Sequence, residues 1–263
     1  MDSRFLQQLQ TLSPISLGDM ESVSLMNRID TKYLATYDQL ALLLGLVRDK
    51  YMVLTINDSC HFEYATTYLD TQDRIMYMAH HNRRLTRQKV RVRNYVDTGD
   101  TFFEVKRKNN HGKTKKKRMQ VESIDTLFRD GADSFLDRVA LLPVKLSDMV
   151  PYVSNRFERI TLVNNQMTER LTIDSGLSFR NLATGNSCDL TGLVVIEVKR
   201  DGMCYSPIAD ILRDLRIKSS GFSKYCIGAA LTDPSLKRNN FKKKLRRIGK
   251  LIDKQIECIY VPN

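Results

Sequence analysis

The feature of this chain that most constrains its fold is a set of charged side chains spaced two residues apart. It occurs in four segments, Arg28–Lys32, Lys89–Arg93, Glu104–Lys108 and Glu197–Lys199. Because successive side chains of a strand point to opposite faces of a sheet, each segment presents its charges on one face. Val or Ile fills the intervening positions in most of these segments, which suits a second face packed against a core. The pattern predicts strands that share one cationic face, and the carboxylates on that face suggest a polyanion and a metal.

A solvated sheet face is the simpler explanation for any one of these segments, because the exposed face of an antiparallel sheet is polar for that reason alone. A solvated face usually mixes both signs of charge with Thr, Ser and Gln. The same excess of Lys and Arg in four segments favours a surface or lumen that binds an anion.

Composition indicates a soluble globular protein. Of the 263 residues, 42% are hydrophobic and 27% are charged. The longest apolar run, Leu40–Val47, is far shorter than the roughly 20 residues that span a bilayer. Five scattered cysteines without a C-x-x-C pair argue for reduced thiols, and against a disulfide framework or a zinc site. We therefore expect a cytoplasmic protein, and peripheral attachment to a membrane stays open.

The positive charge is concentrated in two blocks, residues 105–118 and 237–250, each with eight Lys or Arg and no acid. Together they exceed the formal net charge of +12, so the rest of the chain is slightly acidic. Neither block interleaves aromatic residues with its cations, which disfavours nucleic acid as the partner. Residues 237–250 predict a basic helix with a narrow apolar stripe. Its alternatives are a solvated helix packed on the domain, or a contact with an anionic membrane surface, polyphosphate product or acidic partner.

Strand and helix patterns follow one another without the βαβ alternation of a parallel sheet, which predicts one antiparallel α+β domain. The predicted strands are 23–34, 51–56, 62–69, 88–96, 101–108, 113–121, 151–162, 168–174 and 190–200. The predicted helices are 37–49, two short helices within 124–141, 206–216 and 222–231.

Eight short motifs in this order resemble the VTC-type polyphosphate polymerase domain, a member of the triphosphate tunnel metalloenzymes related to the CYTH proteins. They are RIDTKY (28–33), YLDT (68–71), KVRVRNY (89–95), FEVKRK (103–108), SNRFERI (154–160), ERLTID (169–174), VVIEVK (194–199) and SKY (223–225). The resemblance implies a closed antiparallel β-barrel of about eight strands with flanking helices, whose charged lumen forms a tunnel. It divides the chain into an N-terminal extension (1–23), the tunnel domain (24–232) and a basic, helical C-terminal tail (233–263).

The resemblance also implies roles for individual residues. The catalytic cations would be Lys32, Arg91, Arg93, Lys106 and Lys224. The further phosphate-binding residues would be Arg84, Lys115, Lys117, Arg156, Arg170 and Lys199. The run of lysines leaves the register of Lys115 and Lys117 open, and Arg83 is an alternative to Arg84. Glu197 would hold Mn²⁺ or Mg²⁺, because both ions prefer hard oxygen ligands. Glu104 and Glu158 are weaker metal candidates, and each acid has a salt bridge as its structural alternative.

The first strand departs from the hydrolase branch of this superfamily, which carries E-x-E-x-K. The matching positions here are Arg28, Asp30 and Lys32, so an arginine replaces the first glutamate. We therefore predict a metal-dependent polyphosphate polymerase that transfers the γ-phosphate of ATP to a growing chain. The alternatives are a tunnel-fold tri- or polyphosphatase, and a non-catalytic protein that binds polyphosphate or another polyanion.

Overall fold

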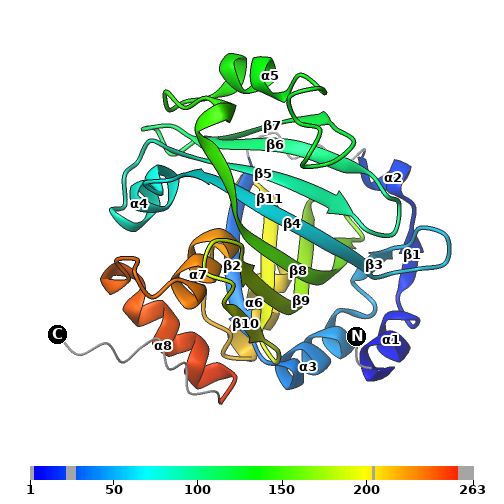
Figure 1. The fold of residues 1–263 in the computed structure, drawn as a ribbon. Coiled ribbons are helices and arrows are strands. Elements are labelled where there is room, and N and C mark those ends of the chain that lie inside the picture. Colours follow the sequence, from blue (N-terminus) through cyan, green and yellow to red (C-terminus); the bar gives the residue numbers. More distant parts are fainter. Residues whose placement is uncertain (1–2, 22–27, 203–204, 254–263) are drawn as a thin grey trace.

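A single curled sheet, antiparallel except for one short parallel pair at its periphery, organises the molecule, with helices on its outer surface and across one end (Figure 1). The computed structural model describes residues 3–21, 28–202 and 205–253. The strands are β1 (Ser13–Ile15), β2 (Arg28–Ala35), β3 (Tyr51–Leu54), β4 (Phe62–Thr71), β5 (Arg87–Tyr95), β6 (Thr101–Lys108), β7 (Thr114–Gln120), β8 (Met149–Asn164), β9 (Glu169–Asn181), β10 (Ser187–Leu190) and β11 (Val194–Asp201). The helices are α1 (Ser3–Leu9), α2 (Leu17–Glu21), α3 (Tyr37–Val47), α4 (Ile75–His81), α5 (Ala132–Val139), α6 (Pro207–Asp214), α7 (Lys224–Thr232) and α8 (Lys242–Leu251), with short 3-10 turns at Leu146–Asp148 and Asn239–Phe241.

The α+β class and the antiparallel sheet are confirmed, but the prediction of a closed barrel is wrong. The main strand order is β2-β11-β9-β8-β4-β5-β6-β7, and β2 and β7 do not pair with each other. The sheet is therefore an open half-barrel. A physical reason is charge: β7 carries four consecutive cations, Lys115–Arg118, and β2 carries Lys32, so direct pairing would set like charges side by side. The free edge of β2 is instead covered in part by Ser219 and Ser220, whose backbone bonds reach Tyr33 and Lys32.

Most predicted elements exist, with shifted ends. Strands β8 and β9 run several residues beyond the predicted ranges, and β1 and β10 were not predicted. Only α5 forms within 124–141. Residues before it fold into a turn because Asp130 accepts hydrogen bonds from the Glu122 backbone and the Thr126 hydroxyl, which compete with helix formation. The part of the predicted first strand at 23–27 and the tail end at 254–263 lie outside the described residues.

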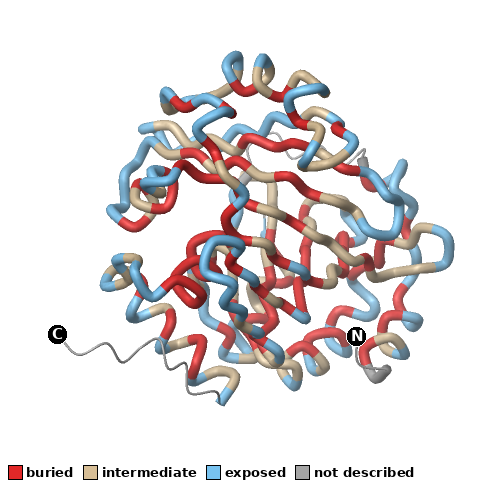
Figure 2. Tube along the Cα trace, in the orientation of Figure 1, coloured by how far each residue is buried: buried red, intermediate tan, exposed pale blue. Residues whose placement is uncertain are grey.

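Helices α1, α3 and α6 cover the convex face of β2, β11, β9 and β8. They bury a continuous apolar layer against the strands. Leu162, Ile173 and Ile196 are fully buried in it, and they alternate with polar residues of the concave face. The strand alternation predicted from the sequence is thus real, with an apolar side under helices and a charged side within the half-barrel. Figure 2 shows the buried strand backbone beside the exposed β7 edge and loops.

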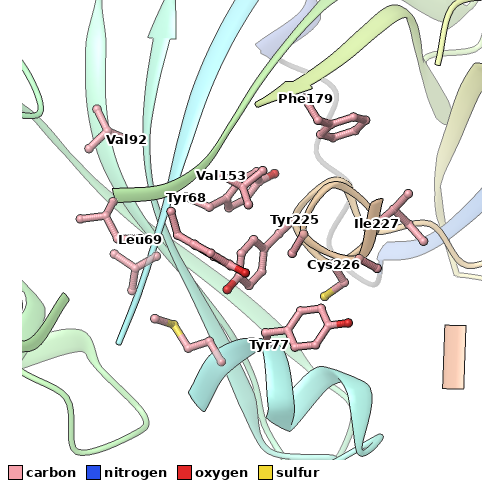
Figure 3. Close-up of a cluster of buried hydrophobic side chains, with 14 of the residues drawn as sticks. Tyr68, Leu69, Tyr77, Val92, Val153, Phe179, Tyr225, Cys226 and Ile227 are labelled. Carbon is pink, nitrogen blue, oxygen red and sulfur yellow. The ribbon is translucent and has the colours of Figure 1, made fainter. Parts of the chain in front are cut away.

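Helices α4 and α7 fill one end of the concave side, where Tyr68, Tyr77 and Tyr225 pack together (Figure 3). The buried carboxylate of Asp70 holds the two helices together, because it accepts hydrogen bonds from the start of α4 and from the Tyr225 hydroxyl. Helix α7 lies so close to β9 that a Cβ on Gly228 would sit 2.4 Å from the Phe179 ring. This packing fixes the start of α7 against the charged face. No helix in the described parts of the chain has the length and apolar character needed to cross a membrane.

Candidate active site

Charged side chains from opposite walls of the half-barrel meet on its concave face. Residues directly opposite in an antiparallel ladder share a face. Lys32 of β2 lies opposite Glu197 of β11, which lies opposite Thr172 of β9. On the other wall, Arg91 of β5 lies opposite Glu104 of β6. The strand register therefore builds one groove from β2, β11, β9, β5 and β6.

Glu197 is the centre of the first group of charges. Its carboxylate lies 3.3 Å from the Lys32 ammonium and 3.9 Å from that of Lys199. Burial raises the pKa of Glu197, but Lys199, Lys32 and Lys106 outweigh that effect and hold the pKa well below its usual range. Lys106 belongs to β6, on the opposite wall, so the half-barrel curls far enough for its two walls to act on one ligand.

Glu104 organises the second group. It is 1% exposed and accepts hydrogen bonds from Arg91 Nε at 2.7 Å and Lys116 Nζ at 2.9 Å. Burial raises the pKa of Glu104, yet Arg91, Arg93 and Lys116 lower it to about 2. The carboxylate is fully occupied by two cations, so it orients Arg91 and is unsuited to be the metal ligand.

Asp174 organises the third group. Its two oxygens accept a bidentate pair of hydrogen bonds from Arg159, at 2.6 and 2.9 Å, and it also binds the Lys224 ammonium. Burial lowers the pKa of Lys224 to about 7, even though Asp174 favours the charged form. Burial likewise lowers the pKa of Lys199 to about 7 against the opposing effect of Glu197. Near neutral pH, these two amines therefore change protonation state easily.

Three cations of the groove have no acid within ion-pair distance among the described residues: Lys89, Arg93 and Lys106. Arg93 is buried and donates to Thr66 Oγ1 at 3.3 Å, while Lys89 donates to Ser223 Oγ at 2.8 Å. Burial lowers the pKa of Arg93 to about 10 and that of Lys89 to about 8. Arg93 is buried, and Lys89 and Lys106 are half-buried. Cations held partly away from water without a counter-ion are costly, and a groove that keeps three of them is suited to an anionic ligand.

Several residues predicted from the sequence come together in this groove: Lys32, Arg91, Arg93, Lys106, Arg170, Lys199, Lys224 and Glu197. Arg170 lies opposite Lys199 in the ladder between β9 and β11, and it contributes to the lowered pKa of that lysine.

Other predicted phosphate-binding residues lie elsewhere. Lys115 and Lys117 are opposite Arg107 and Val105, so they point to the convex side, and Lys116 points into the groove instead. Arg156 is 67% exposed on the convex side, where it pairs with Glu63.

Arg84 is exposed in the loop after α4, outside the groove. Glu158, a weaker metal candidate, has the strand parity of Arg156 and likewise does not face the groove.

Arg159, Asp174, Lys89 and Lys116 were missed as groove residues. A signal for Arg159 was present in the sequence: Ile160 and Leu162 form the apolar half of an alternation, so Arg159 between Phe157 and Ile160 belongs to the other face. Arg156 shares the parity of the apolar half. No comparable signal distinguishes Lys116 from Lys115 and Lys117, because the whole run is cationic.

The donor set around Glu197 fits a divalent ion only together with a phosphate ligand. No group of three or more His, Cys, Asp or Glu side chains forms among residues 3–21, 28–202 and 205–253. Opposite Glu197, the buried Thr172 hydroxyl makes no hydrogen bond, which leaves a second hard oxygen facing the same place. Mg²⁺ and similar ions are commonly held by one or two protein oxygens while phosphates and water complete the shell.

The half-barrel and its groove define a curled-sheet domain that presents converging cations and one candidate metal-binding carboxylate on its concave face. A family model described as the VTC domain matches residues 27–232, which is most of the chain. The chain therefore belongs to the VTC domain family, and the resemblance stated from the sequence is confirmed.

Solved structures with low sequence identity match parts of the fold. A proposed adenylyl cyclase from Hippeastrum, reported to have a dominant triphosphatase activity, is 13% identical, with a TM-score of 0.47 over 77% of this chain and 95% of its own. A proposed adenylate cyclase from Vibrio parahaemolyticus is 11% identical, with a TM-score of 0.44 over 76% of this chain and 97% of its own. A search of the curated proteins finds no match.

Proposed function

We propose that the protein is a metal-dependent polyphosphate polymerase that uses ATP. The observation that carries the proposal is the groove in which Lys89, Arg93 and Lys106 lack acidic partners within ion-pair distance among the described residues, while the Glu197 carboxylate is flanked by two lysines. An excess of fixed cations suits a ligand with many adjacent phosphates. The absence of the E-x-E pair on β2 leaves fewer carboxylates for activating water.

The chain's own residues would act by binding and positioning. Arg91 and Arg93 are suited to bidentate contact with phosphate oxygens, because a guanidinium presents paired donors. Glu104 holds the Arg91 guanidinium in place before the ligand arrives. An oxygen of the acceptor phosphate attacks the γ-phosphorus of ATP, the bond to the β-phosphate oxygen breaks, and ADP leaves. The cations stabilise the charge that spreads over the transferred phosphoryl group.

Glu197 and the Thr172 hydroxyl are the residues that would hold a metal ion such as Mn²⁺ or Mg²⁺. A bound divalent ion supplies charge neutralisation and alignment of neighbouring phosphates. Lys32 and Lys199 flank the same carboxylate, so they would bind phosphate oxygens beside the ion.

A hydrolase is the second candidate, and the observation that favours it is the lowered pKa of the buried Lys224 amine. With a pKa lowered to about 7 by burial, this amine is partly neutral at physiological pH and could accept a proton from water. Water would then replace the acceptor phosphate, and the product would be free phosphate.

The test is to incubate the purified protein with ATP and Mn²⁺ and to measure both polyphosphate chains on a gel and free phosphate. We expect chains from the wild type and a loss of activity on the order of a hundredfold for Arg93→Ala. Glu197→Gln should also lose activity. Arg156→Ala is the matched control, because this arginine is exposed on the convex side.

The products separate the candidate functions. Free phosphate without chains would favour the tri- or polyphosphatase. Tight polyphosphate binding without turnover would favour a non-catalytic binding protein. Equal losses of activity in Arg93→Ala and Arg156→Ala would show that the groove does not take part in the reaction.

A further inference from the structure

A second group of cations lies at one mouth of the groove, where α4 ends and α7 begins. We call Arg83, Arg87, Lys108 and Lys244 the rim cations; they come from the loop after α4, from β5, from β6 and from α8. Half-buried His80 lies among them. Burial lowers its pKa to about 2, and the nearby charges of Lys89, Arg87, Lys244 and Lys108 lower it further. The imidazole is therefore neutral and gives these cations no negative partner.

The rim cations also lack acidic partners. In the described parts of the chain, no Asp or Glu lies within ion-pair distance of any of the four. Arg83 and Arg87 are close enough to Lys244 to lower its pKa, in addition to the effect of burial. Like charges from separate elements repel each other, so their convergence suits an anion that binds between them.

Helix α8 is held firmly in the position that brings Lys244 to this mouth. Leu245 and Ile248 are buried against the rest of the molecule. Arg247 donates to the backbone carbonyls of Lys218 and Ser219 at 2.8 and 3.2 Å. The Lys244 ammonium lies 3.2 Å from where a Cβ of Gly221 would be, beside the segment that leads into α7.

The connection before α8 is anchored as well. His81 Nε2 lies 2.7 Å from Asn239 Oδ1, and Asn240 Nδ2 donates to the His81 carbonyl at 2.9 Å. The Tyr77 hydroxyl donates to the Lys237 carbonyl at 2.8 Å. Helix α8 is thus built onto α4 through buried groups, and Lys244 does not depend on a loose tail for its position.

Lys89 connects the rim to the inner groove. It is one of the cations near His80, and its own pKa is lowered by burial and by Lys106, Lys32 and Arg91. Lys89 Nζ donates to Ser223 Oγ at the start of α7, so this cation stands between the inner groove, with Lys32 and Lys106, and the rim. A compact triphosphate would occupy only one part of this path, whereas a linear phosphate chain would occupy its whole length.

We propose that the rim cations form a second anion site, which holds a linear polyphosphate chain where it passes out of the groove between α4, α7 and α8. This inference rests on the proposed function, and it adds that the groove binds long phosphate chains more tightly than short ones. The family model matches residues 27–232. Lys244 lies outside that range, on α8, so part of the rim site is built by a helix that the family model does not cover.

The test compares the binding of long-chain polyphosphate and of tripolyphosphate to the full-length protein by isothermal titration calorimetry. We expect Lys244→Ala to weaken binding of the long chain about tenfold, as for the loss of one charge-assisted hydrogen bond, and to leave tripolyphosphate binding unchanged. Lys243→Ala is the matched control, because Lys243 is the exposed neighbour on the same helix. Lys108→Ala tests the same site from β6 if the helix variant unfolds.

Each outcome decides one of the two proposals. If the wild type prefers the long chain and both rim variants behave like Lys243→Ala, the rim site is wrong and the proposed function stands. If Lys244→Ala weakens the binding of long-chain polyphosphate and of tripolyphosphate by the same factor, the rim is not a separate site. If the wild type binds no long chain, the polymerase proposal itself fails, because a polymerase must hold its product.

Discussion

Replacing Glu104 with Gln should destabilise the protein and at the same time strengthen its binding of phosphate chains. The carboxylate is 1% exposed and is bound by Arg91 and Lys116, whose side chains are 17% and 42% exposed. Removing one partner of a buried pair generally costs about 3–5 kcal/mol, because the other charge is left uncompensated. Lys116 can turn to solvent, so we expect a loss near the lower value, about 3 kcal/mol.

Anion binding should change in the opposite direction. Glu104 positions Arg91, but it also occupies donors of that guanidinium, and the variant frees these donors for a phosphate. Polyphosphate should therefore restore much of the lost stability, since a ligand that binds only the folded state stabilises it. The pKa of Glu104, about 2, means that its charge is present throughout the neutral range.

The assay is urea unfolding of Glu104→Gln with and without polyphosphate. Glu63→Gln is the control, because Glu63 forms an exposed pair with Arg156 and should change stability by less than about 1 kcal/mol. The reasoning would be refuted if both variants lost the same stability, or if polyphosphate protected Glu104→Gln less than the wild type.

Two further predictions concern the buried lysines and the placement of α7. Burial lowers the pKa of Lys199 and of Lys224 to about 7 in the folded protein, from an ordinary value of 10.5. Between pH 7 and pH 10.5, both lysines are therefore more fully protonated in the unfolded chain than in the folded protein. The free energy of unfolding should therefore rise from pH 7 to 9, by up to about 1 kcal/mol per pH unit for each lysine, and polyphosphate should flatten the rise. A flat profile without ligand in urea titrations would contradict the lowered pKa values. Gly228→Ala should cost about 1–3 kcal/mol, because its Cβ would overlap Phe179. Gly45→Ala, with open space in α3, should be neutral or stabilising, and equal melting temperatures for the two variants would contradict the close packing.

The sequence predicts much of the sheet because strand alternation depends only on local geometry. The R-x-R spacing predicts that Arg91 and Arg93 lie on the same face of the sheet. The structure places Glu104 opposite Arg91, on that face. Alternation also extends to Arg159, through Ile160 and Leu162. The choice of Arg156 followed motif position alone, and strand parity places that residue on the other face.

Long-range features could not be predicted in the same way. Whether β2 pairs with β7 depends on the summed twist of the whole sheet and on repulsion between its edges, which no local pattern encodes. The inward direction of Lys116 depends on the length of the turn after Lys108, since a shift of one residue reverses every side chain. The position of Lys244 depends on how α8 packs on α4, through His81 and residues 237–241.

The measurement that tests the central claim most directly follows the γ-phosphate of ATP. Labelled ATP, Mn²⁺ and an unlabelled polyphosphate primer are incubated with the protein, and the label is measured in chains and in free phosphate. The polymerase predicts label at chain ends in equal amounts to the ADP released, and no transfer in Glu197→Gln. Label that accumulates only as free phosphate would contradict the account.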